Sequence, residues 1–180
     1  WCSRHIVALS PTMKEGLISK GIPEKKVTVI PNASDIELFD SKNNDVSDFF
    51  KRFNHLSQKP FVLYAGALGK VNGIAYMVDI ARVCLNHGAD LNFVVFGEGR
   101  EKSEILKKAT DFNVLNKNFF IYDRISKGEI PDAFLACAVS TSFVIDVKEL
   151  HANSANKFFD TLAAGKPIVI NHEGWQADLI

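Results

Sequence analysis

The sequence contains little cysteine, no excess of charge of either sign and no long hydrophobic run. Its three cysteines, Cys2, Cys84 and Cys137, are widely separated and show no paired metal-ligand spacing, so we expect reduced thiols. Lys plus Arg and Asp plus Glu both total 21, which leaves no overall field that favours nucleic acid or an anionic membrane surface. Apolar stretches such as 133–139 are far shorter than the roughly 18 residues that span a bilayer, and no signal-peptide pattern is present. We expect a cytoplasmic protein, at most peripheral to the inner face of a membrane.

Several catalytic motifs are missing as well. The five histidines are scattered without a spaced Cys or Glu partner, so we expect no bound metal. There is no Gly-x-Ser-x-Gly elbow, no cysteine with a positioned histidine and no Walker loop, which excludes several enzyme classes. Residues 97–100, GEGR, begin like a dinucleotide fingerprint, but Lys102 stands where a third glycine is needed. An NAD-dependent Rossmann enzyme is therefore disfavoured, and we expect no cofactor.

The sequence does contain a regular alternation of short β-branched or aromatic runs with helical stretches. This alternation is typical of a parallel sheet with helices on both faces. The expected strands cover residues 5–9, 27–30, 61–66, 92–97, 119–122, 139–144 and 167–171. The expected helices run over 11–20, capped by Ser10, and over 46–53, 73–86, 100–112, 131–137 and about 155–165. The fold class predicted is α/β, a Rossmann-like doubly wound parallel sheet.

A polar stretch, residues 31–60, interrupts this alternation and lacks a convincing strand. Residues 1–35 hold two strands and one helix, too little to bury a core, so we expect the remnant of an N-terminal domain whose body is missing. We expect residues 36–57 to be an interdomain linker and residues 58–180 to form a C-terminal domain. Because the last residues read as a starting helix, the fold is expected to be incomplete at both ends.

Residues 153–169, NSANKFFDTLAAGKPIV, predict a helix start that binds an anion. Asn153 or Ser154 can cap this helix, Gly165 ends it and Pro167 opens a strand. Lys157 then lies in the first turn, where the helix dipole is already positive, an unfavourable position unless a negative ligand is present. The free amides expected to hold a phosphate are those of Ser154, Ala155, Asn156 and Lys157.

Asp160 lies four residues beyond Asn156 on the same helix face, so it can reach past the phosphate to the hydroxyls of an attached ribose. The alternative left open is that Asp160 only favours the helix start and that Lys157 is solvated. Ligands of open parallel sheets bind beyond the carboxyl ends of the strands, so the strand-to-helix loops are the other places for site residues.

The loop after residues 61–66 holds Gly66, Gly69, Lys70 and Asn72. Its glycines let backbone amides approach an anion, and Lys70 can neutralise a phosphate. An ordinary flexible turn is the alternative.

Three later loops supply further candidates. Gly97 and Glu98 permit a tight turn beside a nucleobase or sugar, or a purely structural turn. Arg124 can contact phosphate or base, and Glu149 can bond a sugar hydroxyl. An exposed loop arginine and a solvated carboxylate are the alternatives for these two residues.

These residues together resemble the C-terminal, donor-binding half of a family 4 (group 1) retaining glycosyltransferase with the GT-B fold, in the bacterial group that acts in surface-polysaccharide assembly. Four elements carry the resemblance, in order: Pro31-Asn32 with Asp35, FVLYAG with Gly69 and Gly73, FVVFGEG, and Ser154-x-Asn156-Lys157 with LAAGKPIV. The resemblance covers almost the whole chain.

The resemblance also implies roles for single residues. Asp160 falls at the second glutamate of a Glu-x7-Glu motif, which binds the donor ribose. The first glutamate of the motif falls at Ala152, so its role near the donor sugar is either unfilled or taken by Glu149. The usual Arg and Lys of the first loop are replaced by Ala67 and Asn72. The charge of the diphosphate is then expected to be met by Lys70, Arg124 and Lys157.

By the same resemblance, the intact enzyme moves a sugar from a UDP-sugar to a glycan or lipid-linked acceptor with retention, as a hexosyl- or N-acetylhexosaminyl-type transferase. Residues 58–180 would be the C-terminal, nucleotide-sugar-binding domain. This chain would supply the donor side, with Lys157 and Arg124 as the catalytic cations, and would be inactive without the missing N-terminal domain. Peripheral membrane contact of the intact enzyme stays open. The alternatives are a UDP-N-acetylglucosamine 2-epimerase-like isomerase of the same fold and a non-catalytic nucleotide-sugar-binding module.

Overall fold

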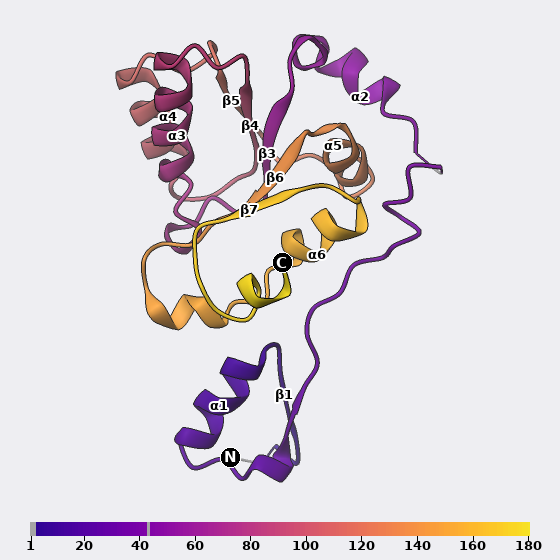
Figure 1. Cartoon of the computed structure of the whole chain (residues 1–180), viewed down its shortest axis with the longest axis vertical. Coiled ribbons are helices and arrows are strands. Elements are labelled where there is room, and N and C mark those ends of the chain that lie inside the picture. The colour runs from indigo at the N-terminus through magenta and orange to yellow at the C-terminus, as the bar shows by residue number, and fades with distance from the viewer. Residues whose placement is uncertain (1–2, 43) are drawn as a thin grey trace.

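The computed structural model describes residues 3–42 and 44–180, in which strands and helices alternate along the chain (Figure 1). The strands are β1 (Ile6–Ala8), β2 (Val27–Val29), β3 (Phe61–Ala65), β4 (Asn92–Phe96), β5 (Phe119–Tyr122), β6 (Val139–Ser142) and β7 (Ile168–Ile170). The α-helices are α1 (Pro11–Ser19), α2 (Ser47–Arg52), α3 (Ala75–Asn86), α4 (Lys102–Asp111), α5 (Ile130–Ala136) and α6 (Asn156–Ala163). Each predicted strand and helix is present, with ends that differ by at most two residues.

The larger sheet has five strands in the order β5-β4-β3-β6-β7, and every pairing in it is parallel. From β3 the chain steps outward to β4 and β5 on one side and then returns to β6 and β7 on the other. The strand order therefore reverses between β3 and β6, and such a reversal opens a crevice at the carboxyl ends of these strands. The predicted α/β doubly wound class is confirmed.

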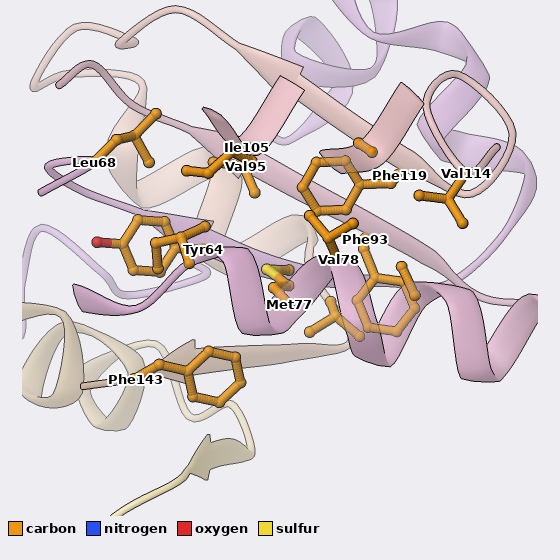
Figure 2. Close-up of a cluster of buried hydrophobic side chains, with 14 residues drawn as sticks. Tyr64, Leu68, Met77, Val78, Phe93, Val95, Ile105, Val114, Phe119 and Phe143 are labelled. Carbon is orange, nitrogen blue, oxygen red and sulfur yellow. The ribbon is translucent and has the colours of Figure 1, made fainter. Parts of the chain in front are cut away.

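Helices cover both faces of the five-stranded sheet (Figure 1). On one face α3 and α4 pack against β3 and β4, and Figure 2 shows the buried side chains there, among them Tyr64, Met77 and Phe93. On the other face α2 and α5 bury a cluster rich in phenylalanine, including Phe49 and Phe134. Each fully buried side chain of this size contributes about 1.5–3 kcal/mol, so β3 and β4 form the rigid centre of the fold.

The smaller sheet pairs β1 with β2 in parallel, and with α1 it forms a separate unit at the end of a long connection (Figure 1). Ser10 caps α1 as predicted, because its hydroxyl accepts a hydrogen bond from the Met13 amide at 3.1 Å. The same hydroxyl donates to the carbonyl oxygen of Ala152 at 2.7 Å, in the 3-10 helix η4 (Lys148–Ala152). The first unit is thus hydrogen-bonded to the segment that precedes α6.

Two expectations from composition concern the thiols and the membrane. Cys84 and Cys137 are both free, and burial raises the pKa of the Cys137 thiol, while Cys2 lies outside the described residues. Among the helices of the described chain, none combines the length and the hydropathy needed to cross a bilayer.

Glycines bring the loops after β3 and β4 into direct backbone contact. The amide of Gly66 donates to the carbonyl of Phe96 at 3.0 Å, and the amide of Leu68 donates to the carbonyl of Glu98 at 2.8 Å. A Cβ atom added to Gly97 would lie only 2.1 Å from the carbonyl oxygen of Gly66. Gly97 is therefore required for the close approach of two backbones that carry site residues.

Substitution of Gly97 by Ala is expected to lower the free energy of unfolding by roughly 1–3 kcal/mol, because the added methyl group forces these loops apart. The matched control is Gly128→Ala, where no heavy atom lies within 4 Å of the new Cβ. We expect the control to change stability by no more than about 0.5 kcal/mol. Urea unfolding of both variants measures the difference, and equal stabilities would refute the packing role.

Candidate functional site

A cavity of about 640 Å³ opens at the carboxyl ends of β3, β4 and β5, between α5 and α6. Of the residues predicted from the sequence, those that line it are Gly66, Asn72, Glu98, Arg124, Ala155, Asn156, Lys157 and Asp160. The predicted residues that do not line it are Gly69, Lys70, Gly97, Glu149 and Ser154. Most of the predicted residues are thus brought together at the edge of the sheet where the strand order reverses.

The start of α6 differs from the prediction in how it is capped. The N-cap residue is Ala155, which makes no side-chain cap bond, so a cap by Asn153 or Ser154 was wrong. The buried Ser154 hydroxyl instead accepts a hydrogen bond from the backbone amide of Asn32 at 3.3 Å. The Ser154 side chain therefore bonds to the polar connector, at a residue 122 positions away, and not to the start of its own helix.

The first turn of α6 faces the cavity with free donors. The amide of Phe158 bonds to the carbonyl of Ala155 at 3.1 Å, but within the described chain the amides of Ala155, Asn156 and Lys157 meet no acceptor. All three residues line the cavity. Unpaired amides at the positive end of a helix form a site suited to an anion.

Lys157 brings a positive charge to the same place. Its Nζ lies 5.1 Å from the centroid of the Tyr64 ring, and the Tyr64 hydroxyl donates to the carbonyl of Ala67 at 2.8 Å. Gly66 leaves room for this side chain, since a Cβ there would lie 3.2 Å from Lys157 Cε. Burial lowers the pKa of Lys157 to about 8, and the nearby charge of Asp160 only partly offsets that effect.

No ion pair to Lys157 is present in the part of the chain that the structure describes. The ammonium group is therefore held against an aromatic ring and beside open amides, without a carboxylate in contact. A buried cation with no carboxylate in direct contact is costly, and perturbed groups of this kind concentrate at functional sites.

Asp160 lies one turn further along α6 and is half-buried. Its Oδ1 accepts a hydrogen bond from the Ser34 hydroxyl at 2.7 Å. Burial raises the pKa of Asp160, whereas the bond from Ser34 and the charge of Lys157 lower it. Its second oxygen has no hydrogen-bond partner among the described residues, so it can accept from a ligand hydroxyl in the cavity.

The remaining predicted residues of the cavity lie at its rim. Arg124 follows β5 and is exposed, with no ion pair to the described residues. Glu98 is held by Lys102 at 2.6 Å, and the Asn72 side-chain amide donates to the carbonyl of Ala67 at 2.9 Å. Arg124 is thus the second cation available to an anion bound in the cavity.

Sequence reasoning missed the apolar wall of the cavity and the contribution of the connector. The wall consists of Phe96, Ile125, Ile130 and Phe134, which suits a flat, partly apolar ligand group. Asn32 lines the cavity and Ser34 bonds Asp160. Asn32 was noted as part of a motif but given no role, and nothing in the local pattern could place Ser34 beside a residue 126 positions away.

Four predicted residues have other surroundings. Lys70 and Glu149 are exposed, Gly69 precedes the 3-10 helix η3 (Lys70–Asn72), and Gly97 packs against Gly66. For Gly97 the purely structural alternative fits the geometry. As for metals, no group of three or more His, Cys, Asp or Glu side chains in residues 3–42 and 44–180 is placed to hold one.

Comparison with known proteins identifies the family. Residues 45–180 match the family model of the glycosyl transferases group 1. The chain belongs to this family, and its sheet is that of a C-terminal GT-B domain.

The chain is similar to one curated protein in sequence and to several solved structures in fold. WcaI of Escherichia coli (strain K12), provisionally assigned as a colanic acid biosynthesis glycosyl transferase, is 26% identical over 117 residues, which are 64% of this chain and 28% of WcaI. The structure of Anabaena Alr3699/HepE in complex with UDP and glucose superposes with a TM-score of 0.82 at 17% identity, covering 99% of this chain and 47% of HepE. The C-terminal domain of LpcC, a glycosyl transferase group 1 family protein from Francisella tularensis, gives 0.58 at 17% identity, covering 77% and 70%. The chain thus spans less than half the length of WcaI and of HepE.

Because the lowered pKa of Lys157 records a cost of burial, removal of its charge is expected to stabilise the fold. Between the folded pKa of about 8 and the ordinary value of 10.5 only the unfolded chain binds this proton, so stability rises with pH across that window. At pH 7 the largely buried Lys157 carries its charge in both the folded and the unfolded chain, and Lys157→Met should raise the free energy of unfolding by roughly 1–3 kcal/mol. The gain should shrink as the pH approaches 10.5.

Urea unfolding at pH 7 and pH 10 measures this difference. The control is Lys148→Met, which removes an exposed lysine and should leave stability and its pH dependence unchanged. A Lys157→Met gain that does not depend on pH would contradict the account, because it would reflect only the added apolar surface.

Proposed function

We propose that the cavity binds the donor of a retaining glycosyltransferase, a nucleoside diphosphate sugar with UDP as its nucleotide. The observation that carries the proposal is the cation Lys157, which forms no ion pair with the described residues and lies beside the free amides of Ala155 and Asn156, one turn before a carboxylate. In this assignment the diphosphate lies on the first turn of α6 and Asp160 accepts hydrogen bonds from the ribose. The apolar wall formed by Phe96, Ile125, Ile130 and Phe134 receives the base.

The proposed catalytic roles follow from the negative charge that develops on the leaving diphosphate. Cleavage of the bond between the sugar and the diphosphate leaves additional negative charge on the departing oxygen. Amides and cations that are already oriented towards that oxygen stabilise the transition state more than the ground state. Lys157 and Arg124 are the catalytic groups in this proposal, since both line the cavity and neither is paired with a carboxylate in the described chain.

The substrate class rests on the relatives as well as on the cavity. HepE was crystallised with UDP and glucose, and the name of WcaI assigns it to colanic acid biosynthesis. We therefore propose a UDP-hexose or UDP-N-acetylhexosamine donor and a glycan or lipid-linked acceptor in bacterial surface-polysaccharide synthesis. The enzyme would act in the cytoplasm, with peripheral contact to the inner face of the membrane.

The presence of two separate sheets supports the assignment of donor and acceptor binding to two domains of the intact protein. We propose that residues 1–35 belong to the N-terminal domain, which would bind the acceptor, and that residues 36–57 are the linker. Residues 58–180 contain the five-stranded sheet and the cavity, and so form the donor-binding part.

Replacement of Lys157 by Ala tests the proposal. In the intact enzyme, loss of one charge-stabilising donor should lower kcat by roughly 10²–10³. Calorimetric titration of UDP should show weaker binding to the same variant, because a cation beside the diphosphate is gone.

The control is Lys70→Ala, which removes a lysine that does not line the cavity and should change kcat by less than about threefold. Near-normal turnover of Lys157→Ala would contradict the role of this residue. No heat of binding with millimolar UDP would contradict the donor site as a whole, and an epimerised UDP-sugar without transfer would show an isomerase instead.

A further inference from the structure

Three side chains from distant parts of the chain hold three consecutive carbonyl groups immediately before α6. We propose that Ser10, Asn32 and Trp175 are positioning residues of the diphosphate site, which hold the peptide units of residues 152–154 in one orientation so that the backbone entering α6 presents the amide of Ala155 to the cavity. This inference rests on the proposed function, because it concerns the same site. We call these three residues the carbonyl clamp.

The hydrogen bonds of the carbonyl clamp fall on successive residues. The Ser10 hydroxyl donates to the carbonyl oxygen of Ala152 at 2.7 Å, and Trp175 Nε1 donates to that of Asn153 at 2.7 Å. The side-chain amide of Asn32 donates to the carbonyl oxygen of Ser154. In the sequence the donors lie 142, 22 and 122 residues from their acceptors.

Each donor is itself held in place. Ser10 is fully buried and also caps α1. The indole ring of Trp175 packs on Phe159, with ring centroids 6.0 Å apart. Asn32 makes a second bond, from its backbone amide to the Ser154 hydroxyl at 3.3 Å.

The planarity of the peptide bond converts these contacts into an orientation of amides. In a trans peptide unit the C=O of one residue and the N–H of the next point in opposite directions. When Asn32 holds the carbonyl of Ser154, the amide of Ala155 must point the opposite way, and Ala155 lines the cavity. In the same way Trp175 fixes the direction of the Ser154 amide.

A fixed orientation of the Ala155 amide should increase the affinity for a ligand. In the stretch between η4 and α6, the Asn153 amide bonds to Leu150 and the Ala155 carbonyl accepts from Phe158, but neither bond holds the carbonyl groups of Asn153 and Ser154. A ligand that had to order this stretch would bind more weakly, since the entropy of ordering opposes binding. Because the carbonyl clamp orders this stretch before binding, a ligand that accepts a hydrogen bond from the Ala155 amide does not have to order it.

Two members of the carbonyl clamp lie outside the residues matched by the family model. Ser10 and Asn32 both precede residue 45, where that match begins. Ser10 belongs to the unit of the smaller sheet and Asn32 to the connector that follows β2. Segments outside the five-stranded sheet would therefore set the affinity for the diphosphate.

The test compares two ligands that differ only in the diphosphate. Affinities for UDP and for uridine are measured with the wild-type protein and with Asn32→Ala and Trp175→Phe, by calorimetry for UDP and by NMR titration for uridine. Phe keeps a ring against Phe159 and removes only the N–H donor. We expect each variant to bind UDP roughly 5- to 20-fold more weakly, as loss of a bond that orients charge-binding amides implies. Uridine affinity should stay within about twofold of the wild-type value, since the nucleoside carries no phosphate.

Ser19→Ala is the matched control, because it also removes a hydroxyl donor to a backbone carbonyl, that of Gly16, at an exposed place. It should change neither affinity. Thermal melting of each variant shows that it is folded, and the two clamp variants keep the test valid if one of them does not fold.

The outcomes distinguish a failure of the carbonyl clamp from a failure of the donor site. Equal losses for UDP and uridine, or no loss for either, would overturn the inference while UDP binding by the wild-type protein still supported the donor site. Failure of the wild-type protein to bind UDP would overturn the proposed function, and the inference with it.

Discussion

The structure depends most on an imbalance of charge at the first turn of α6. A lysine ammonium lies there against the face of Tyr64, beside amides that have no acceptor, and the described chain provides no carboxylate in contact with it. Burial of an unpaired cation opposes folding, which is why its pKa falls to about 8. A bound anion would reverse this imbalance, so the conformation that is costly for the free protein is the one suited to a diphosphate.

The fold makes this arrangement possible because its most apolar strands, β3 and β4, pair side by side at the centre of the sheet. β3 and β4 are buried between helices on both faces, and their loops meet through Gly66 and Gly97 with backbones in contact. The absence of a side chain at Gly66 also leaves space for the side chain of Lys157 above Tyr64. A rigid sheet therefore positions a candidate site whose lining groups come mostly from loops and from one helix start.

The fold and half of the residues that line the candidate site could be predicted from the sequence, because they depend on local periodicity and on the places where strands end. Runs such as 61–65 and 92–96 are apolar throughout, as strands buried on both faces must be, and helical spacing placed Asp160 one turn beyond Asn156. The cap of α6 could not be predicted, because Ser154 bonds a residue 122 positions away instead of its own helix. The same holds for Ser34, Trp175 and the apolar wall, which only the packed chain brings to the cavity.

The most direct measurement is the structure of the protein with UDP bound. The account predicts phosphate oxygens within about 3 Å of the amides of Ala155, Asn156 and Lys157, the normal distance of an N–H···O hydrogen bond. The same structure should show ribose hydroxyls on the free oxygen of Asp160. A complex in which UDP lies elsewhere, or in which the first turn of α6 carries no phosphate, would contradict the account.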